Sequence, residues 1–221
     1  MNIDYSKLEN LKIFEKNIKQ KIIKINGLIL SNKKNIILKS IKKSSKIPSK
    51  IFKYNNKIVK HEFNDFTKFN NNLKNLYQEL NSKKFINILK KIFNLKELYS
   101  DKKNLYSGLN ISHKGSILKE HVDFNYSNEL RKFRSINLLL YLNLNYKKRD
   151  GGRFYYINID TKKRIYIDPF YNKAVIFMTN KNVPHGFTKV NKKRISLNLY
   201  YYTNKNLSLT NQKHKTYWKN A

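Results

Sequence analysis

The chain has 221 residues and a mass of 26.6 kDa, enough for one domain with a helical extension but not for two large domains. It contains no cysteine, which excludes disulfides, thiolate metal sites and a cysteine nucleophile. Lysine and arginine total 47 against 14 acidic residues, which gives a net charge of +33. This charge is spread along a chain that is also rich in Asn, Ile and Tyr. The spread favours compositional bias over a dedicated site for a polyanion.

The N-terminal half begins with a segment that carries acidic residues and lacks the apolar core of a signal peptide. No stretch approaches the roughly 18 apolar residues that span a bilayer, so we expect a soluble, cytoplasmic protein without a membrane span. Apolar residues between 8 and 25 recur at spacings of three, four or seven, which predicts a helix that ends near Gly27. Residues 43–65 contain Pro48, serines and paired asparagines, and predict a connector with short extended pieces.

Two further helices are predicted from a more regular apolar pattern. The first stripe begins at Phe69, and the second follows Ser82, which is a candidate N-cap. The members of the two stripes are Phe69, Leu73, Leu76, Tyr77 and Leu80, then Phe85, Ile88, Leu89 and Ile92. We expect both helices to be structural and to belong to a helical N-terminal region, residues 1–98, that packs on the following domain.

From about residue 105 the chain changes to short runs of Tyr, Phe, Ile and Leu that are separated by glycine and proline, which is typical of an all-β domain. Strands are predicted near 106–112, 117–123, 135–142, 153–159, 163–167, 174–178 and 194–203. Strands at this spacing favour a sandwich or a jelly roll. The polar tail, residues 204–221, could fray, or could dock on the domain by its aromatic pair Tyr217 and Trp218.

The stretch HVDFN, residues 121–125, places His121 and Asp123 two positions apart. On a strand such residues point to the same face, about 6.6 Å apart along the backbone. One more histidine would complete a 2-His-1-carboxylate triad, which holds non-heme Fe(II) and leaves positions open for a cosubstrate and oxygen. On its own, the pair also fits two polar residues that alternate on a strand. The remaining histidines are His61, His113, His185 and His214.

Among these histidines, His185 in NVPHGF is the best candidate, because it precedes the last long predicted strand and a jelly roll can bring such a segment against an early strand. Arg194 follows nine residues later, and Ser196 shares its strand face. A guanidinium and a hydroxyl in this position would bind a carboxylate through charge-assisted hydrogen bonds. We predict that His61 lies on the surface, and that His113, in a turn before Gly115, faces solvent or supports a ligand.

The motifs HVDFN, LLLYLN, DGG, VPHGF and RISLNLYYYT, in this order and spacing, resemble the iron(II)- and 2-oxoglutarate-dependent dioxygenases of the prolyl-4-hydroxylase-like type. The match runs from Tyr99 to Thr203, and residues 76–101 resemble the helical segment that precedes this domain in bacterial and viral members. The resemblance implies a mainly β fold with N-terminal helices and a double-stranded β-helix (jelly-roll) core over residues 99–203. It implies an enzyme that uses Fe(2+), 2-oxoglutarate and O2, with ascorbate as a candidate reductant.

The same resemblance implies roles for individual residues. His121, Asp123 and His185 would bind iron, and Arg194 would pair with the far carboxylate of 2-oxoglutarate. Ser196 fits the Arg-x-Ser version of that carboxylate site. Tyr141 stands where related enzymes add a hydroxyl group to the cosubstrate, although it is equally one more aromatic residue in a tyrosine-rich strand. No general base is required, so no catalytic residue is expected beyond the iron ligands.

The interior of the barrel would be dry, lined by apolar side chains drawn from Leu138, Leu140, Ile176 and Phe177, with the choice among them open. In the Asp150-Gly151-Gly152 stretch, the glycine pair is interpreted as the turn that starts the next strand.

The sequence leaves the substrate open between a prolyl or other peptide side chain and a small molecule. Arg131, Arg134 and Arg153 are the candidates for contacting an anionic substrate. A nucleic-acid demethylase on the same fold would make use of the high charge, but those enzymes typically carry a second arginine shortly after the first, and none follows Arg194. A non-catalytic basic binding module is the third interpretation, and it would not need a carboxylate receptor nine residues after His185.

Overall fold

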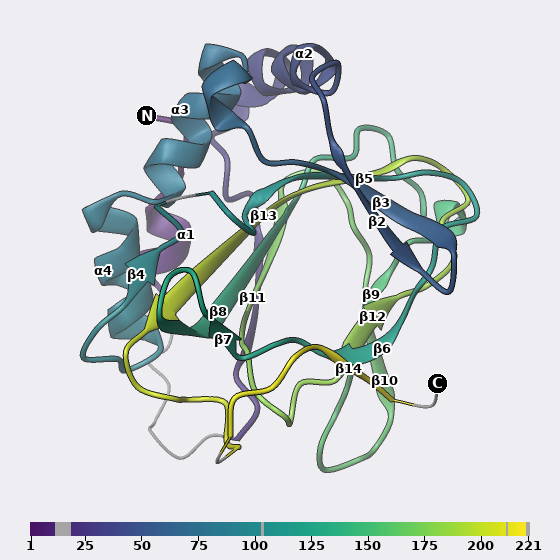
Figure 1. Ribbon diagram of the computed structural model, residues 1–221. Coiled ribbons are helices and arrows are strands. Elements are labelled where there is room, and N and C mark those ends of the chain that lie inside the picture. Colours follow the sequence, from purple (N-terminus) through teal and green to yellow (C-terminus); the bar gives the residue numbers. More distant parts are fainter. Residues whose placement is uncertain (12–18, 103, 211, 220–221) are drawn as a thin grey trace.

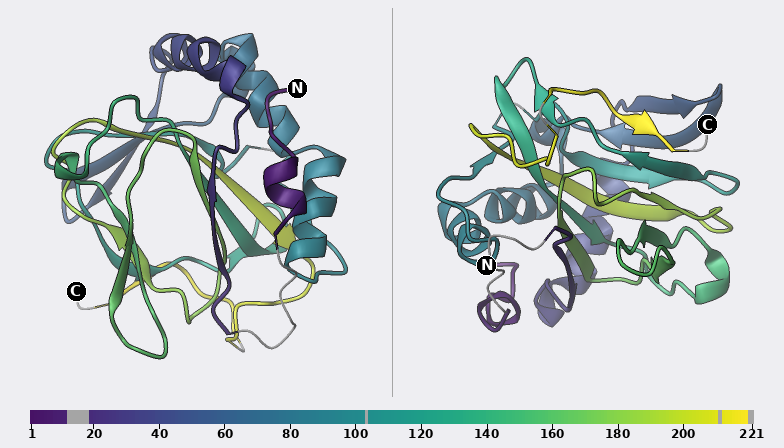
Figure 2. Two further views of the ribbon diagram at one scale, coloured as in Figure 1. Left: turned by 180° about the vertical axis from the view of Figure 1, so that it is seen from behind. Right: turned by 90° about the horizontal axis from the view of Figure 1, so that it is seen from below.

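A computed structural model describes residues 1–11, 19–102, 104–210 and 212–219 (Figure 1). Two antiparallel sheets face each other around a common interior, and the helices cover the outer face of the larger sheet (Figures 1 and 2). This arrangement is a jelly roll, so the predicted fold class, mainly β with N-terminal helices, is confirmed.

The helices precede most of the barrel in the chain. The α-helices are α1 (Ser6–Glu9), α2 (Lys34–Ser44), α3 (Asn71–Leu80) and α4 (Lys83–Ile92), and the 3-10 helices are η1 (Ser31–Lys33), η2 (Phe66–Lys68) and η3 (Lys148–Asp150). The two regular apolar stripes are confirmed as α3 and α4, and Ser82 caps α4 by accepting a hydrogen bond from the Phe85 N–H at 3.2 Å. Within the described ranges, no helix has the length and apolar character to cross a membrane.

The larger sheet contains the strands that carry Tyr141, Arg194 and Ser196. Its order is β1 (Ile22–Asn26), β11 (Lys173–Met178), β8 (Lys132–Tyr141), β13 (Arg194–Thr203), β5 (Gly108–Ser112), β3 (Lys57–Phe63) and β2 (Lys50–Tyr54), with β4 (Tyr99–Ser100) beside β13 and β7 (Tyr126–Ser127) beside β8. The order of the smaller sheet is β10 (Arg164–Ile167), β9 (Phe154–Ile157), β12 (His185–Phe187), β6 (Leu118–Val122) and β14 (Tyr217–Trp218). All seven predicted strands are therefore present, each within a few residues of its expected bounds.

The N-terminal region differs from the prediction because it is not helical throughout. Residues 22–26 form β1 rather than the end of a helix, and pair with β11 so that Ile23 and Ile25 are buried while Lys24 is exposed. Ile18, the centre of the predicted stripe, lies outside the described residues. The short extended pieces predicted within residues 43–65 are present as β2 and β3, which form a hairpin whose turn residues Asn55 and Asn56 have φ values of 47° and 60°.

Two apolar layers lie on opposite faces of the larger sheet. Leu138, Leu140 and Ile176 pack with the helices, so the expectation that they line the barrel is wrong. The side chains of β8 and β11 that face the interior are Leu139, Tyr141, Val175 and Phe177. Phe177 is thus the only one of the four lining candidates on the interior side, because alternate residues of a strand point to opposite faces.

Asp101 organises the loop that leads into β5. Its buried carboxylate accepts hydrogen bonds from the backbone N–H groups of Leu105, Tyr106 and Ser107 at 3.1, 2.8 and 3.0 Å. We expect Asp101→Ala to lower the free energy of unfolding by about 3 kcal/mol, because buried donors are left without partners. Urea unfolding measures this loss, and the exposed Asp160→Ala is the control, expected within about 0.5 kcal/mol of wild type. Equal stability of the two variants would contradict this role.

Candidate active site

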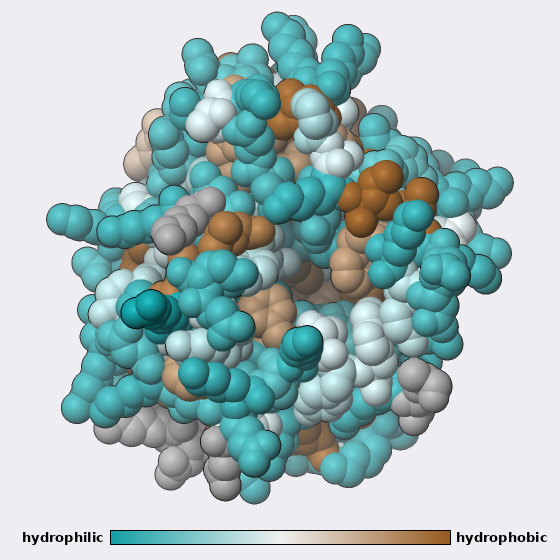
Figure 3. All heavy atoms as spheres, viewed as in Figure 1, coloured by the Kyte–Doolittle hydropathy of each residue, from teal (hydrophilic) through white to brown (hydrophobic). Residues whose placement is uncertain are grey.

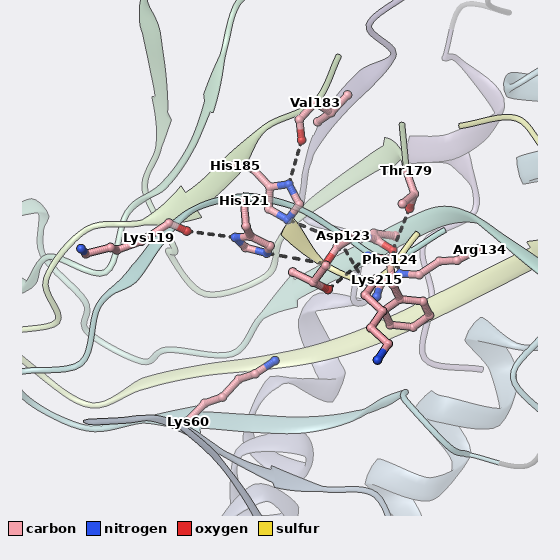
Figure 4. Close-up of polar contacts among 12 residues, drawn as sticks. Lys60, Lys119, His121, Asp123, Phe124, Arg134, Thr179, Val183, His185 and Lys215 are labelled. Carbon is pink, nitrogen blue, oxygen red and sulfur yellow. Dashed lines mark hydrogen bonds and ion pairs between the residues drawn. The ribbon is translucent and has the colours of Figure 1, made fainter. Parts of the chain in front are cut away.

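Three potential metal ligands converge on the smaller sheet. His121 is on β6, Asp123 directly follows that strand, and His185 lies opposite His121 on the adjacent strand β12. The His121 and His185 Nε2 atoms lie 3.6 and 3.4 Å from the two Asp123 carboxylate oxygens. One ligand atom from each residue lies within 4.8 Å of the others, and the three side chains point toward one another in Figure 4. This geometry can hold one metal ion.

In both histidines the tautomer leaves Nε2, the ring nitrogen on the side of Asp123, available to bind a metal ion. The Nδ1 atom of His121 lies 2.9 Å from the Lys119 carbonyl oxygen, and the Nδ1 atom of His185 lies 2.9 Å from that of Val183. A carbonyl only accepts, so Nδ1 carries the proton and Nε2 keeps its lone pair, as in metal-binding histidines. Burial and, to a smaller extent, the neighbouring His121 together lower the pKa of His185 to about 4, so the ring is neutral at pH 7.

The Asp123 carboxylate is held by a buried polar network. Its Oδ2 atom accepts hydrogen bonds from Arg134 Nη2 at 3.0 Å and from Asn137 Nδ2 at 2.7 Å. Asn137 in turn accepts from Arg134 Nε at 2.8 Å and from the Thr179 hydroxyl at 3.2 Å. Burial raises the pKa of Asp123, but the adjacent Arg134 guanidinium outweighs this effect and holds the pKa well below its ordinary value.

Arg134 was predicted as a candidate for contacting an anionic substrate, but the structure places it in a buried ion pair with Asp123. It is 5% exposed, lies on β8, and packs over the rings of Tyr200 and Phe124 at 3.7 and 4.7 Å. The guanidinium therefore positions and neutralises Asp123. This role was not predicted, because the sequence around residue 130 is polar and does not show where the turn ends and the buried strand begins.

We expect Asn137→Leu to weaken metal binding about 10- to 100-fold, because it removes a hydrogen bond that orients Asp123 without changing the charge of the site. Calorimetric titration with Co(II) under anaerobic conditions measures the affinity. The exposed Asn191→Leu serves as the matched control and is expected to bind Co(II) as wild type does. An unchanged affinity in Asn137→Leu would exclude an orienting role for the amide.

Arg194 lies across the interior, at the start of β13 on the larger sheet. It is 5% exposed, and it donates from Nε to the Gly152 carbonyl at 3.0 Å and from Nη2 to the Tyr141 hydroxyl at 3.4 Å. Its guanidinium packs over the rings of Phe187 and Tyr141 at 4.5 and 5.0 Å. In the part of the chain that the structure describes, no carboxylate pairs with it, so this buried cation is available for an anionic ligand.

A cavity of about 60 Å³ connects Arg194 with the three potential metal ligands. Asn110 and Asn198 line its walls, and each has a buried side-chain atom without a hydrogen-bond partner, as does the Ser196 hydroxyl. Ser196 shares a strand face with Arg194 and Asn198, although it does not line the cavity itself. Unpaired polar atoms beside a buried cation fit a dicarboxylate held between Arg194 and a metal ion.

The glycine pair after Asp150 does more than start a strand. Gly151 and Gly152 have φ values of 72° and 58°, a region that favours glycine. A Cβ atom on Gly152 would lie 2.9 Å from Cδ of Arg194, and one on Gly151 would lie 2.1 Å from the Lys189 carbonyl oxygen. The pair therefore allows the close backbone approach that fixes Arg194.

The other predicted site residues lie apart from the metal ligands. Arg131 is exposed in the turn before β8, and Arg153 pairs with Asp168 at 2.6 Å. His113 is exposed, as predicted, whereas His61 is half-buried with its ring centroid 5.4 Å from that of His113. Neither histidine joins the group around Asp123.

Comparison with known proteins agrees with this geometry. The family model of the 2OG-Fe(II) oxygenase superfamily matches residues 107–202. No curated protein matches the sequence.

Solved structures show the same fold. A prolyl hydroxylase from Trichoplax adhaerens, in complex with a hypoxia inducible factor peptide fragment, superposes with a TM-score of 0.66 at 17% identity, covering 88% of this chain and 89% of that one. A Pseudomonas putida prolyl-4-hydroxylase gives 0.62 at 11% identity, with 85% and 94% covered. The alpha-ketoglutarate-dependent epimerase SnoN of nogalamycin biosynthesis gives 0.63 at 9% identity, with 90% and 84% covered. At these identities the likeness concerns the fold.

Proposed function

We propose that the chain is a 2OG-Fe(II) oxygenase of the prolyl-4-hydroxylase-like type, and that it hydroxylates a prolyl or other side chain within a peptide while 2-oxoglutarate is decarboxylated to succinate. The observation that carries the proposal is the single cavity that joins Arg194 to His121, Asp123 and His185. A peptide substrate is supported by the likeness to an enzyme solved with a peptide fragment.

In this proposal the smaller sheet binds the metal ion and the larger sheet binds the cosubstrate. His121, Asp123 and His185 hold Fe(II), which when bound supplies the oxygen chemistry of the reaction. Arg194 binds the far carboxylate of 2-oxoglutarate, with Tyr141 donating its hydroxyl hydrogen bond toward the same ligand. Burial raises the pKa of Tyr141 although Arg194 opposes the shift, so the hydroxyl stays protonated and can donate. The apolar side chains Leu139 and Phe177 line the cavity and exclude water from it.

The test begins with the wild-type protein under anaerobic conditions. Fe(II) and 2-oxoglutarate together are expected to produce the weak visible charge-transfer band of their chelate, which neither gives alone. Admission of oxygen is then expected to form succinate, and proline-containing peptides are expected to increase its rate. Absence of both the band and succinate would refute the proposal, whereas succinate without stimulation by any peptide would redirect the search to small molecules.

A further inference from the structure

The polar C-terminal tail is anchored next to the metal ligands rather than frayed. Asn125, which is fully buried two residues after Asp123, donates from Nδ2 to the Ser208 and Thr210 hydroxyls and to the Gln212 carbonyl at 2.8, 3.1 and 3.0 Å. Its Oδ1 accepts from the backbone N–H of His214 at 2.8 Å. A buried amide with all these partners specifies one path for the tail.

The anchored tail ends in β14, which pairs with β6 and places Trp218 directly opposite His121. The Trp218 ring centroid lies 4.9 Å from that of His121 and 4.0 Å from that of Tyr54 in the β2–β3 hairpin. Trp218 therefore bridges the tail and the hairpin beside a potential metal ligand. Figure 1 shows the hairpin and β14 on the same side of the barrel.

Trp218 also lines a second pocket, of about 230 Å³, which reaches His121 and Asp123 but is not lined by Arg194. Five aromatic side chains form a large part of its wall. They are Phe52, Tyr106, Phe124, Tyr200 and Trp218. Figure 3 shows the surface hollowed near the centre of this view, with apolar residues in the hollow and along parts of its edge. A group bound in this pocket would lie against the potential metal ligands.

The charged groups of this pocket are paired within it. Lys60 binds Glu62 at 2.8 Å, and Arg134 binds Asp123 at 3.0 Å. Among the described residues that line the pocket, no charged side chain is left without an opposite partner. A charged ligand would have to break one of these pairs or lose its own hydration uncompensated, so the pocket suits an uncharged group.

We propose that the C-terminal tail forms part of the substrate pocket, and that Trp218 is a specificity-determining residue that contacts an uncharged substrate side chain presented by an extended peptide. The inference rests on the proposed oxygenase function, since it assigns this pocket to the substrate of that reaction. Flat aromatic walls bind rings and aliphatic groups by contact area and dispersion, and a pocket of this volume admits a single side chain.

Trp218 is the only tryptophan of the chain, so its fluorescence reports on this pocket alone. The protein loaded with Co(II) and 2-oxoglutarate under anaerobic conditions is titrated with blocked pentapeptides Gly-Gly-X-Gly-Gly, where X is Pro, Leu, Phe, Lys or Glu. We expect Co(II) to quench the emission, and peptides with Pro, Leu or Phe to shift it at concentrations at least about tenfold lower than those with Lys or Glu. Equal responses to charged and uncharged peptides, or no response to any of them, would overturn the inference.

Three variants separate a substrate contact from a structural role. Peptide-dependent succinate formation is expected to fall about tenfold in Trp218→Ala and less in Trp218→Phe, with the effect on KM rather than on Co(II) affinity. Tyr217→Ala, which changes the exposed neighbour on the same strand, is expected to behave as wild type. If Trp218→Ala retains the wild-type peptide preference, the inference fails while the oxygenase function stands. If wild type binds neither Co(II) nor 2-oxoglutarate, the proposed function itself fails.

Discussion

Asp123→Ala is expected to abolish Fe(II) binding and succinate formation, and also to destabilise the metal-free protein by about 3–5 kcal/mol. The loss of activity follows from the removal of one of three metal ligands. The loss of stability has a separate cause, because Arg134 is buried and its only acidic partner among the described residues is Asp123. Anaerobic Co(II) titration and urea unfolding in the presence of a chelator measure the two effects independently.

Two matched variants separate the effects of Asp123 on binding and on folding. His121→Ala should also abolish metal binding but should leave the ion pair between Arg134 and Asp123 in place, so its loss of stability should be smaller. The double variant Asp123→Ala with Arg134→Leu should regain much of the stability of the single variant, because the uncompensated charge is gone, yet bind no metal. A double variant that is less stable than Asp123→Ala would show that Arg134 contributes mainly by packing against Tyr200 and Phe124.

The sequence was sufficient for the part of the site in which spacing fixes geometry. Two residues at i and i+2 of a strand must share a face, so His121 and Asp123 could be paired before the fold was known. The place of His185 required knowledge of which strands are neighbours. Its strand, β12, has only three residues and was not predicted, although its pairing with β6 creates the site.

In uninterrupted apolar runs of a strand, the sequence did not predict which side chains face the interior of the barrel. In LLLYLN every residue is apolar or buried, so no alternation distinguished Leu139 from Leu138, and the choice of lining residues stayed open until the fold placed Leu138 on the helix side. The helix predicted up to Gly27 failed for a related reason. The short run IIKIN has a pattern compatible with both periods, and its pairing with the edge of β11 decided in favour of a strand.

Long-range polar contacts were beyond the reach of sequence reasoning. Asn125 belongs to the HVDFN stretch itself, yet its partners lie more than 80 residues away in the tail. Arg134 was predicted only as a candidate for contacting an anionic substrate, and its contact with Asp123 was not predicted. Both residues connect the metal ligands to the surrounding fold, and such supporting contacts depend on how strands are placed rather than on local pattern.

Arg194→Met is expected to lower the affinity for 2-oxoglutarate by about 30-fold or more, since truncation of one partner of a buried charge pair costs at least about 2 kcal/mol. Arg194→Lys should fall between this variant and wild type, because an ammonium group keeps the charge but cannot reproduce the two-pronged contact. Arg153→Met is the control, since that arginine already pairs with Asp168 at 2.6 Å. Equilibrium titration of the Co(II)-loaded proteins with 2-oxoglutarate measures all four affinities.

The stability of the Arg194 variant should change in the opposite direction from that of Asp123→Ala. Arg194 is buried without an acidic partner in the described residues, so its replacement removes a desolvated charge, and the ligand-free variant should be at least as stable as wild type. Saturating 2-oxoglutarate, at about 100 times its Kd, should stabilise metal-loaded wild type by about 2.7 kcal/mol and the variant much less. The opposite result would be an Arg194→Met protein that is less stable than wild type without ligand but binds 2-oxoglutarate equally well. It would show that the guanidinium stabilises the fold through its hydrogen bonds to Gly152 and Tyr141 and does not bind the cosubstrate.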